Sequence, residues 1–89
     1  MKYNSESHIN TVDQVKEFLD YLAMERKVNF HPDDDFSDYI NLNTNEPTFN
    51  AEEVAIFNTL MDEAFVVCES NQTDIYELAN ATMQCMLKQ

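Results

Sequence analysis

Glycine is absent from these 89 residues, and its absence excludes several kinds of binding site. Loops that wrap phosphate groups need backbone at positive φ with no Cβ in the way. Walker loops and dinucleotide-binding loops are therefore excluded. There are only two prolines, whereas asparagine, which tolerates left-handed turns, is plentiful. This composition favours helices joined by asparagine-rich turns.

Basic residues are scarce and unevenly placed. Five Lys and Arg stand against seventeen Asp and Glu, which gives a formal net charge of −12. None of the five lies between residues 28 and 87. Such a segment repels nucleic acid and anionic membranes and attracts cationic surfaces. We therefore expect no direct contact with nucleic acid or membrane. The acidic side chains either keep the protein soluble or bind a basic protein.

Long apolar runs are missing too. The longest, "AFVVC" at residues 64–68, is far short of the roughly 20 residues of a membrane span. The first ten residues lack the apolar stretch of a secretion signal. The two cysteines, Cys68 and Cys85, fit reduced, buried thiols. We predict a cytoplasmic protein without a disulfide.

The spacing of apolar residues predicts an all-α fold, because it repeats at three and four positions along three segments. Thr11 with Gln14, and Asn50 with Glu53, have the spacing of capping boxes at two helix starts. We expect a small three- to four-helix bundle, with helices near 12–27, 51–69 and 74–88 and a short helical turn near 35–41.

The connections predict how these elements pack. The short link at 70–73 should make the last two helices antiparallel, with the first helix across them. Residues 1–10 carry one isolated large apolar residue, Ile9, and are expected to form a flexible N-terminal arm. Residues 11–89 are expected to form a single helical domain.

The stretch from 31 to 50 is rich in Asp, Glu and Asn, and two frames in it have the oxygen spacing of a calcium loop. One begins at Asp33 and the other at Asn41. Both fail at the sixth position, which needs glycine, where Asp38 and Glu46 stand. No pair of Cys or His has the spacing of a zinc site. We predict no metal site and no cofactor, and a polar crossing that adds to a negative surface.

Catalytic groups do not converge in this sequence. His8 and His31 are the only histidines available as bases. His31 has acidic neighbours and Ser37 nearby, but a histidine beside a loop proline is typical of a solvated side chain. The cysteines lie on apolar stripes in acidic surroundings, which disfavour a reactive thiolate. We predict that the protein is not an enzyme.

Two surfaces remain as candidates for binding. One is apolar and suits self-association, although the same residues would alternatively close the core of a monomer; it comprises Ile56, Leu60, Val67, Met83 and Met86. The other is acidic and comprises Asp33, Asp34, Asp35, Asp38 and Glu46. We predict a protein–protein interaction module that binds a protein partner or forms a homodimer. The alternative is an acidic inhibitor or nucleic-acid mimic that binds a basic protein.

Overall fold

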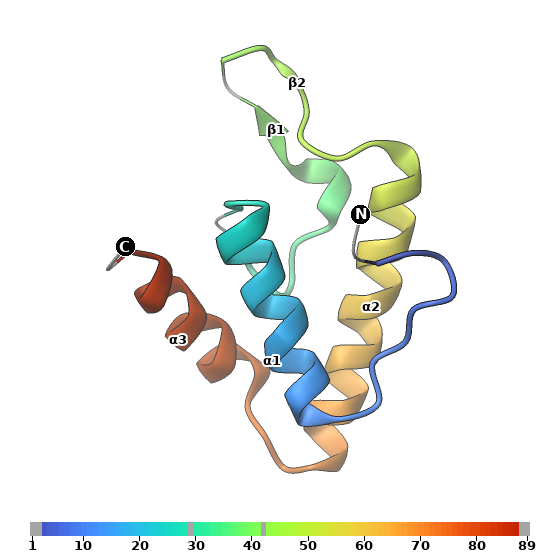
Figure 1. The fold of residues 1–89 in the computed structure, drawn as a ribbon, viewed down its shortest axis with the longest axis vertical. Coiled ribbons are helices and arrows are strands. Elements are labelled where there is room, and N and C mark those ends of the chain that lie inside the picture. The colour runs from blue at the N-terminus through green and yellow to red at the C-terminus, as the bar shows by residue number, and fades with distance from the viewer. Residues whose placement is uncertain (1–2, 29, 42, 88–89) are drawn as a thin grey trace.

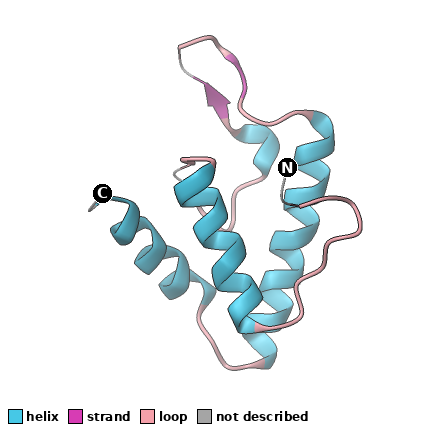
Figure 2. Cartoon of the chain, in the orientation of Figure 1, coloured by secondary structure: helices cyan, strands magenta, loops and turns pink. Residues whose placement is uncertain are grey.

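The computed structural model describes residues 3–28, 30–41 and 43–87. These residues are mostly helical, with little strand (Figures 1 and 2). None of the helices described here is both long and apolar enough to cross a membrane. Along this part of the chain the elements are α1 (Val12–Asp20), η1 (Tyr21–Glu25), η2 (Phe36–Asp38), β1 (Ile40–Asn41), β2 (Glu46–Pro47), α2 (Ala51–Ser70) and α3 (Ile75–Leu87). The prediction of a mostly helical protein is confirmed.

Both predicted capping boxes are present. The Thr11 hydroxyl accepts the Gln14 N–H at 3.2 Å, and the Gln14 side chain accepts the Thr11 N–H. At the start of α2 the Asn50 side chain accepts the Glu53 N–H at 2.8 Å, and Glu53 accepts the Asn50 N–H in return. These bonds satisfy backbone donors that a helix leaves open at its first turn.

The first helix ends differently from the prediction of a regular helix to residue 27. After Asp20 the chain continues as η1, a π-helical segment in which the Arg26 N–H donates to the Tyr21 carbonyl at 3.1 Å. Lys27 then takes a left-handed conformation with φ of 54°. The wider turn keeps Tyr21, Leu22 and Ala23 all buried. Apolar spacing alone does not distinguish such a segment from an α-helix.

The end of α2 is a Schellman motif without glycine. The Thr73 N–H donates to the Cys68 carbonyl at 2.8 Å, and the Gln72 N–H donates to the Glu69 carbonyl at 3.2 Å. Gln72 has a φ of 54°, in the left-handed region that usually holds glycine or asparagine at this position. Asparagine takes the left-handed conformation at Asn45 (φ of 58°), whereas lysine and glutamine do so at the two helix ends.

An aromatic cluster around Phe57 forms the centre of the core. The Phe57 side chain is fully buried on α2. Its ring centroid lies between 5.1 and 6.2 Å from those of four other rings. These come from α1, η1 and the 30–50 connection, and they are Phe18, Tyr21, Phe36 and Phe49. The predicted crossing segment is thus fixed to the helices by two of its own phenylalanines.

The three α-helices do not pack as the predicted antiparallel pair with a third helix across it. Figure 1 shows α2 and α3 running in opposite directions from their shared turn but diverging beyond it. In this view α1 stands between them, and it contacts both. The loop length set the reversal of direction, but the bulk of α1 keeps the two later helices apart.

The region near residues 35–41 contains less helix than predicted. Only η2 is helical, and Tyr39 after it is extended. Ile40 belongs to β1, pairs with Pro47 of β2, and is 51% exposed. Figure 1 shows this two-stranded hairpin standing away from the helices. No strand was predicted here, although asparagines such as Asn43 and Asn45 favour the turn that joins β1 to β2.

Residues 3–10, predicted to be a loose arm, lie against the helices. The Tyr3 ring makes edge-on contacts with Phe18 at 5.4 Å and Tyr21 at 5.1 Å. Ile9 is buried, and its N–H donates to the Glu63 side chain of α2 at 2.9 Å. An isolated apolar residue therefore anchors this segment, together with one carboxylate contributed from far along the chain.

The cysteines differ in environment. Both are free thiols in the described structure. Cys68 is buried on α2, as predicted, but Cys85 on α3 is exposed, contrary to prediction. Burial raises the pKa of the Cys68 thiol, and the nearby Asp74 charge adds to this.

Candidate functional site

Three of the five predicted acidic residues meet at one hollow. Asp33, Asp34 and Asp35 line it from the loop, and Asp62 lines it from α2. The rest of its lining is Pro32, Asn58, Met61 and Phe65. Asp38, on η2, and Glu46, on the hairpin, are exposed but do not line this hollow. The structure therefore joins the aspartate run to an acidic residue of α2 rather than to the rest of its own loop.

The aspartates at 33 and 34 receive hydrogen bonds from tyrosine hydroxyls. The Tyr76 hydroxyl of α3 donates to Asp33 Oδ1 at 2.6 Å. The Tyr39 hydroxyl donates to Asp34 Oδ2 at 3.3 Å and accepts the His31 N–H at 3.0 Å. The Asp33 carboxylate raises the pKa of Tyr76, and burial raises the pKa of Tyr39 to about 12. Both tyrosines are therefore neutral donors near neutral pH.

Asp35 has a structural role at the start of η2. Its Oδ1 accepts the Ser37 N–H at 2.8 Å and an N–H of the Asn58 side chain at 3.1 Å. Asn58 Oδ1 in turn accepts the Phe36 N–H. These bonds, led by that of the Ser37 backbone, lower the pKa of Asp35. The carboxylate stays ionised, and it fixes the loop to α2.

A second hollow adjoins the first and shares Pro32 with it. This groove runs between residues 30–32 and α3, with a volume of about 720 Å³. Phe30, Pro32 and Ala79 are buried residues of its wall, and Met83 is half-buried. The polar part of the lining is His31, Asp74, Tyr76, Glu77 and Asn80. An apolar floor with acidic groups beside it is thus present next to the aspartate run.

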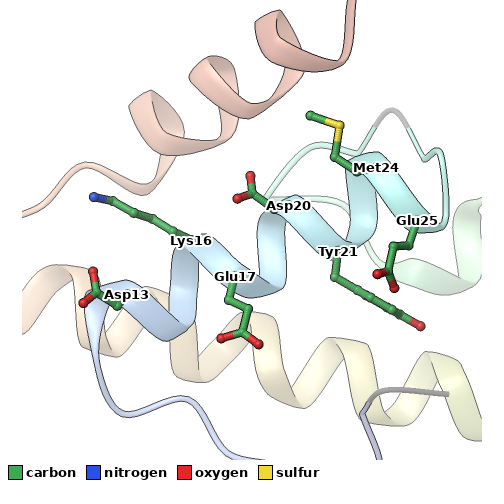
Figure 3. A pocket seen from close by; sticks show the side chains of 7 residues that line it. All are labelled: Asp13, Lys16, Glu17, Asp20, Tyr21, Met24 and Glu25. Atoms are coloured by element: carbon green, nitrogen blue, oxygen red, sulfur yellow. The ribbon is translucent and has the colours of Figure 1, made fainter. Parts of the chain in front are cut away.

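A third hollow lies along α1 and η1. Figure 3 shows the seven side chains that line it. Asp20 and Met24 point to one side of the helix, whereas Glu17 and Tyr21 point to the other. Lining groups that diverge in this way from a single helix do not surround a substrate. This hollow is therefore the weakest of the three as a binding site.

The predicted apolar surface is not formed as expected. Ile56, Leu60 and Val67 are buried among the core residues of the described chain. Met83 lines the groove beside α3, and the side chain of Met86 lies outside the described residues. The broad apolar stripe of α2 is buried, because α1 and the N-terminal segment pack over it. Among the large apolar residues of α2, Val66 is exposed at the surface, at 63%.

The two histidines make contacts with neighbouring side chains and backbone. His31 Nδ1 accepts the Asp33 N–H at 3.2 Å, and its ring lies 5.9 Å from that of Tyr76. His8 Nδ1 lies within hydrogen-bonding distance of Glu63, at 3.0 Å. Across the residues that the structure describes, no three side chains of His, Cys, Asp or Glu are grouped to hold a metal ion.

Sequence reasoning missed three residues of this region. Asp74, Tyr76 and Glu77 lie together at the start of α3 and line the groove. Their exposure could be predicted from helical spacing, because they lie outside the apolar stripe that runs through Ile75 and Ala79. Their proximity to residues 30–33 could not be predicted from the sequence, because it depends on how α3 packs.

Comparison with known proteins identifies no relative. The sequence matches no protein-family model and no curated protein, and the fold matches no solved structure.

Proposed function

We propose that this chain is a non-enzymatic protein–protein interaction module of the cytoplasm, built as a three- to four-helix bundle, that binds a basic protein. The supporting observation is the gathering of six acidic residues around two adjoining hollows. We call this surface the acidic face; it comprises Asp33, Asp34, Asp35, Asp62, Asp74 and Glu77.

Electrostatics favour a cationic partner at the acidic face. Residues 28–87 contain no Lys or Arg, so no cation of this segment neutralises these carboxylates. Charges gathered around a concave surface focus their field and raise the association rate of oppositely charged molecules. The same field repels nucleic acid, which makes an acidic inhibitor of a DNA-binding protein one form of the proposal.

Affinity capture with matched variants tests this proposal. The first variant carries Asp33→Asn, Asp34→Asn and Asp62→Asn, which remove three charges from the acidic face. The control also loses three negative charges, but at exposed positions elsewhere, through Glu6→Gln, Asp13→Asn and Glu52→Gln. Circular dichroism establishes that both variants fold.

We expect basic proteins captured by the wild type at moderate salt to be lost with the first variant and retained with the control. An equal loss with both would assign the binding to net charge alone. No loss with either would reject the acidic face. A captured DNA-binding protein that releases DNA when this chain is added would support the inhibitor form.

Self-association is a second candidate, and the exposure of Val66 favours it. Val66 lines a hollow with Ile9 and Val67, beside the polar residues Asn10, Asp62 and Glu63. Its exposure gives α2 an apolar spot at the surface. We propose this spot as the centre of a homodimer contact. Light scattering at high micromolar concentration tests it: a dimer that Val66→Lys dissociates would support the contact, and a monomeric wild type would exclude it.

A further inference from the structure

The groove between residues 30–32 and α3 has a feature that a purely electrostatic surface lacks. Its wall includes the buried residues Phe30, Pro32 and Ala79. Met83 closes one side and is half-buried. Water in contact with apolar groups is displaced favourably by an apolar side chain. Methionine adapts its shape readily to such an occupant.

The acidic and aromatic groups at the edge of this groove specify a cation beside that apolar side chain. Asp74 and Glu77 line the groove from the start of α3. Tyr76, which lies between them in sequence, is a residue 45% exposed, and its hydroxyl donates to Asp33 at 2.6 Å. A partly exposed tyrosine with a fixed hydroxyl, next to carboxylates, suits a guanidinium or ammonium group.

We propose that this groove is the docking site for a cationic segment of the partner protein, in which a large apolar side chain stands beside Lys or Arg. This inference rests on the proposed function, because the groove is part of the acidic face. Charge complementarity decides the occupant. An anionic ligand is repelled at this edge, and a second copy of the chain brings its own net charge of −12.

Two synthetic peptides test the apolar part of the inference. The probe is a fluorescein-labelled 12-residue peptide of Lys, Arg and Leu, and its sister has Ser in place of every Leu. Binding is measured by fluorescence anisotropy at low and moderate salt. We expect the wild type to bind the Leu peptide about tenfold more tightly, because one buried Leu side chain supplies at least that factor.

Two variants of α3 locate the site. Asn80→Lys adds a cation inside the groove, and Ala81→Lys adds the same charge at an exposed position that does not line it. We expect Asn80→Lys to weaken binding of the Leu peptide at least threefold more than Ala81→Lys does. Amide shifts of the wild type on binding the Leu peptide should centre on residues 30–33 and 74–83.

The outcomes separate this inference from the proposed function. Three results would overturn the groove as the docking site. They are equal affinity for both peptides, equal effects of the two lysine substitutions, and amide shifts centred elsewhere. The acidic face would still be supported as a binding surface if the variant with Asp33→Asn, Asp34→Asn and Asp62→Asn no longer bound either peptide. Failure of both peptides to bind at low salt would overturn the groove and the acidic face together.

Discussion

Arg26 and Glu53, 27 positions apart in the chain, join the end of η1 to the first turn of α2. The Arg26 guanidinium donates to Glu53 Oε2, and the two side chains are only 26% and 16% exposed. The guanidinium carbon also lies 5.0 Å from the centroid of the Phe49 ring and 5.9 Å from that of Phe57. The ion pair therefore covers the aromatic cluster and connects three separate segments.

Glu53→Gln should remove the negative charge of this pair while keeping a side-chain oxygen that accepts the Asn50 N–H. We expect the free energy of unfolding at pH 7 to fall by about 1 kcal/mol, the scale of a partly buried ion pair. Urea unfolding measures this change. Glu52→Gln, in the same helical turn but exposed, is the matched control and should change the stability little. Equal effects of the two substitutions would contradict a specific role for the pair.

The same pair predicts a dependence of stability on pH. The hydrogen bond from Arg26 lowers the pKa of Glu53 below its ordinary value of 4.5. A carboxylate with a lowered folded-state pKa stabilises the fold above the unfolded pKa, and this contribution is lost as the pH falls through the folded pKa. Urea titrations between pH 7 and pH 3 should therefore show a shallower acid loss for Glu53→Gln than for the wild type. Parallel curves would contradict this assignment.

Phe57→Ala should destabilise the protein more than any surface change. The side chain is fully buried among four aromatic rings, and truncation of such a phenylalanine costs about 3–5 kcal/mol. Thr59→Ala, two positions further along α2 at an exposed site, should change the stability by less than about 0.5 kcal/mol. Thermal or urea unfolding followed by circular dichroism compares the two. A mild effect of Phe57→Ala would mean that the aromatic cluster is not the core.

Gln72→Gly should stabilise the protein, which is unusual for a substitution to glycine. Gln72 has a φ of 54° at the end of α2, and this conformation crowds any Cβ. We expect a gain of roughly 0.5–1 kcal/mol, since removal of the Cβ relieves this crowding. Gln72→Ala is the control, because alanine keeps the Cβ and should bring no gain. A loss of stability with glycine would show that the Schellman motif does not form.

The two thiols should react at different rates. Cys85 is exposed, whereas Cys68 is buried and has a raised pKa. We expect Cys85 to react with a thiol reagent at pH 8 at least about a hundredfold faster, because Cys68 reacts only when the core opens. Cys85→Ser should remove the fast phase, and Cys68→Ser should leave it unchanged. Two fast thiols in the wild type would contradict the burial of Cys68.

Part of the candidate site was predictable from the sequence, and part was not. The aspartates at 33–35 were found from charge density in one short stretch. Asp62 and Glu77 belong to other helices, and only packing brings them to the same two hollows. The apolar stripe of α2 was recognised, but the sequence left open whether Ile56 and Leu60 form a contact surface or close the core, because it does not show how much of a stripe its neighbours cover.

The sequence by itself determined the helical segments, the two capping boxes and the sign of the surface charge, because each depends on residues within a few positions of one another. Tertiary structure alone decided the π-helical end of the first helix and the bond between Tyr76 and Asp33. These depend on partners up to 43 positions apart, whose approach is set by packing around Phe57 rather than by local preference.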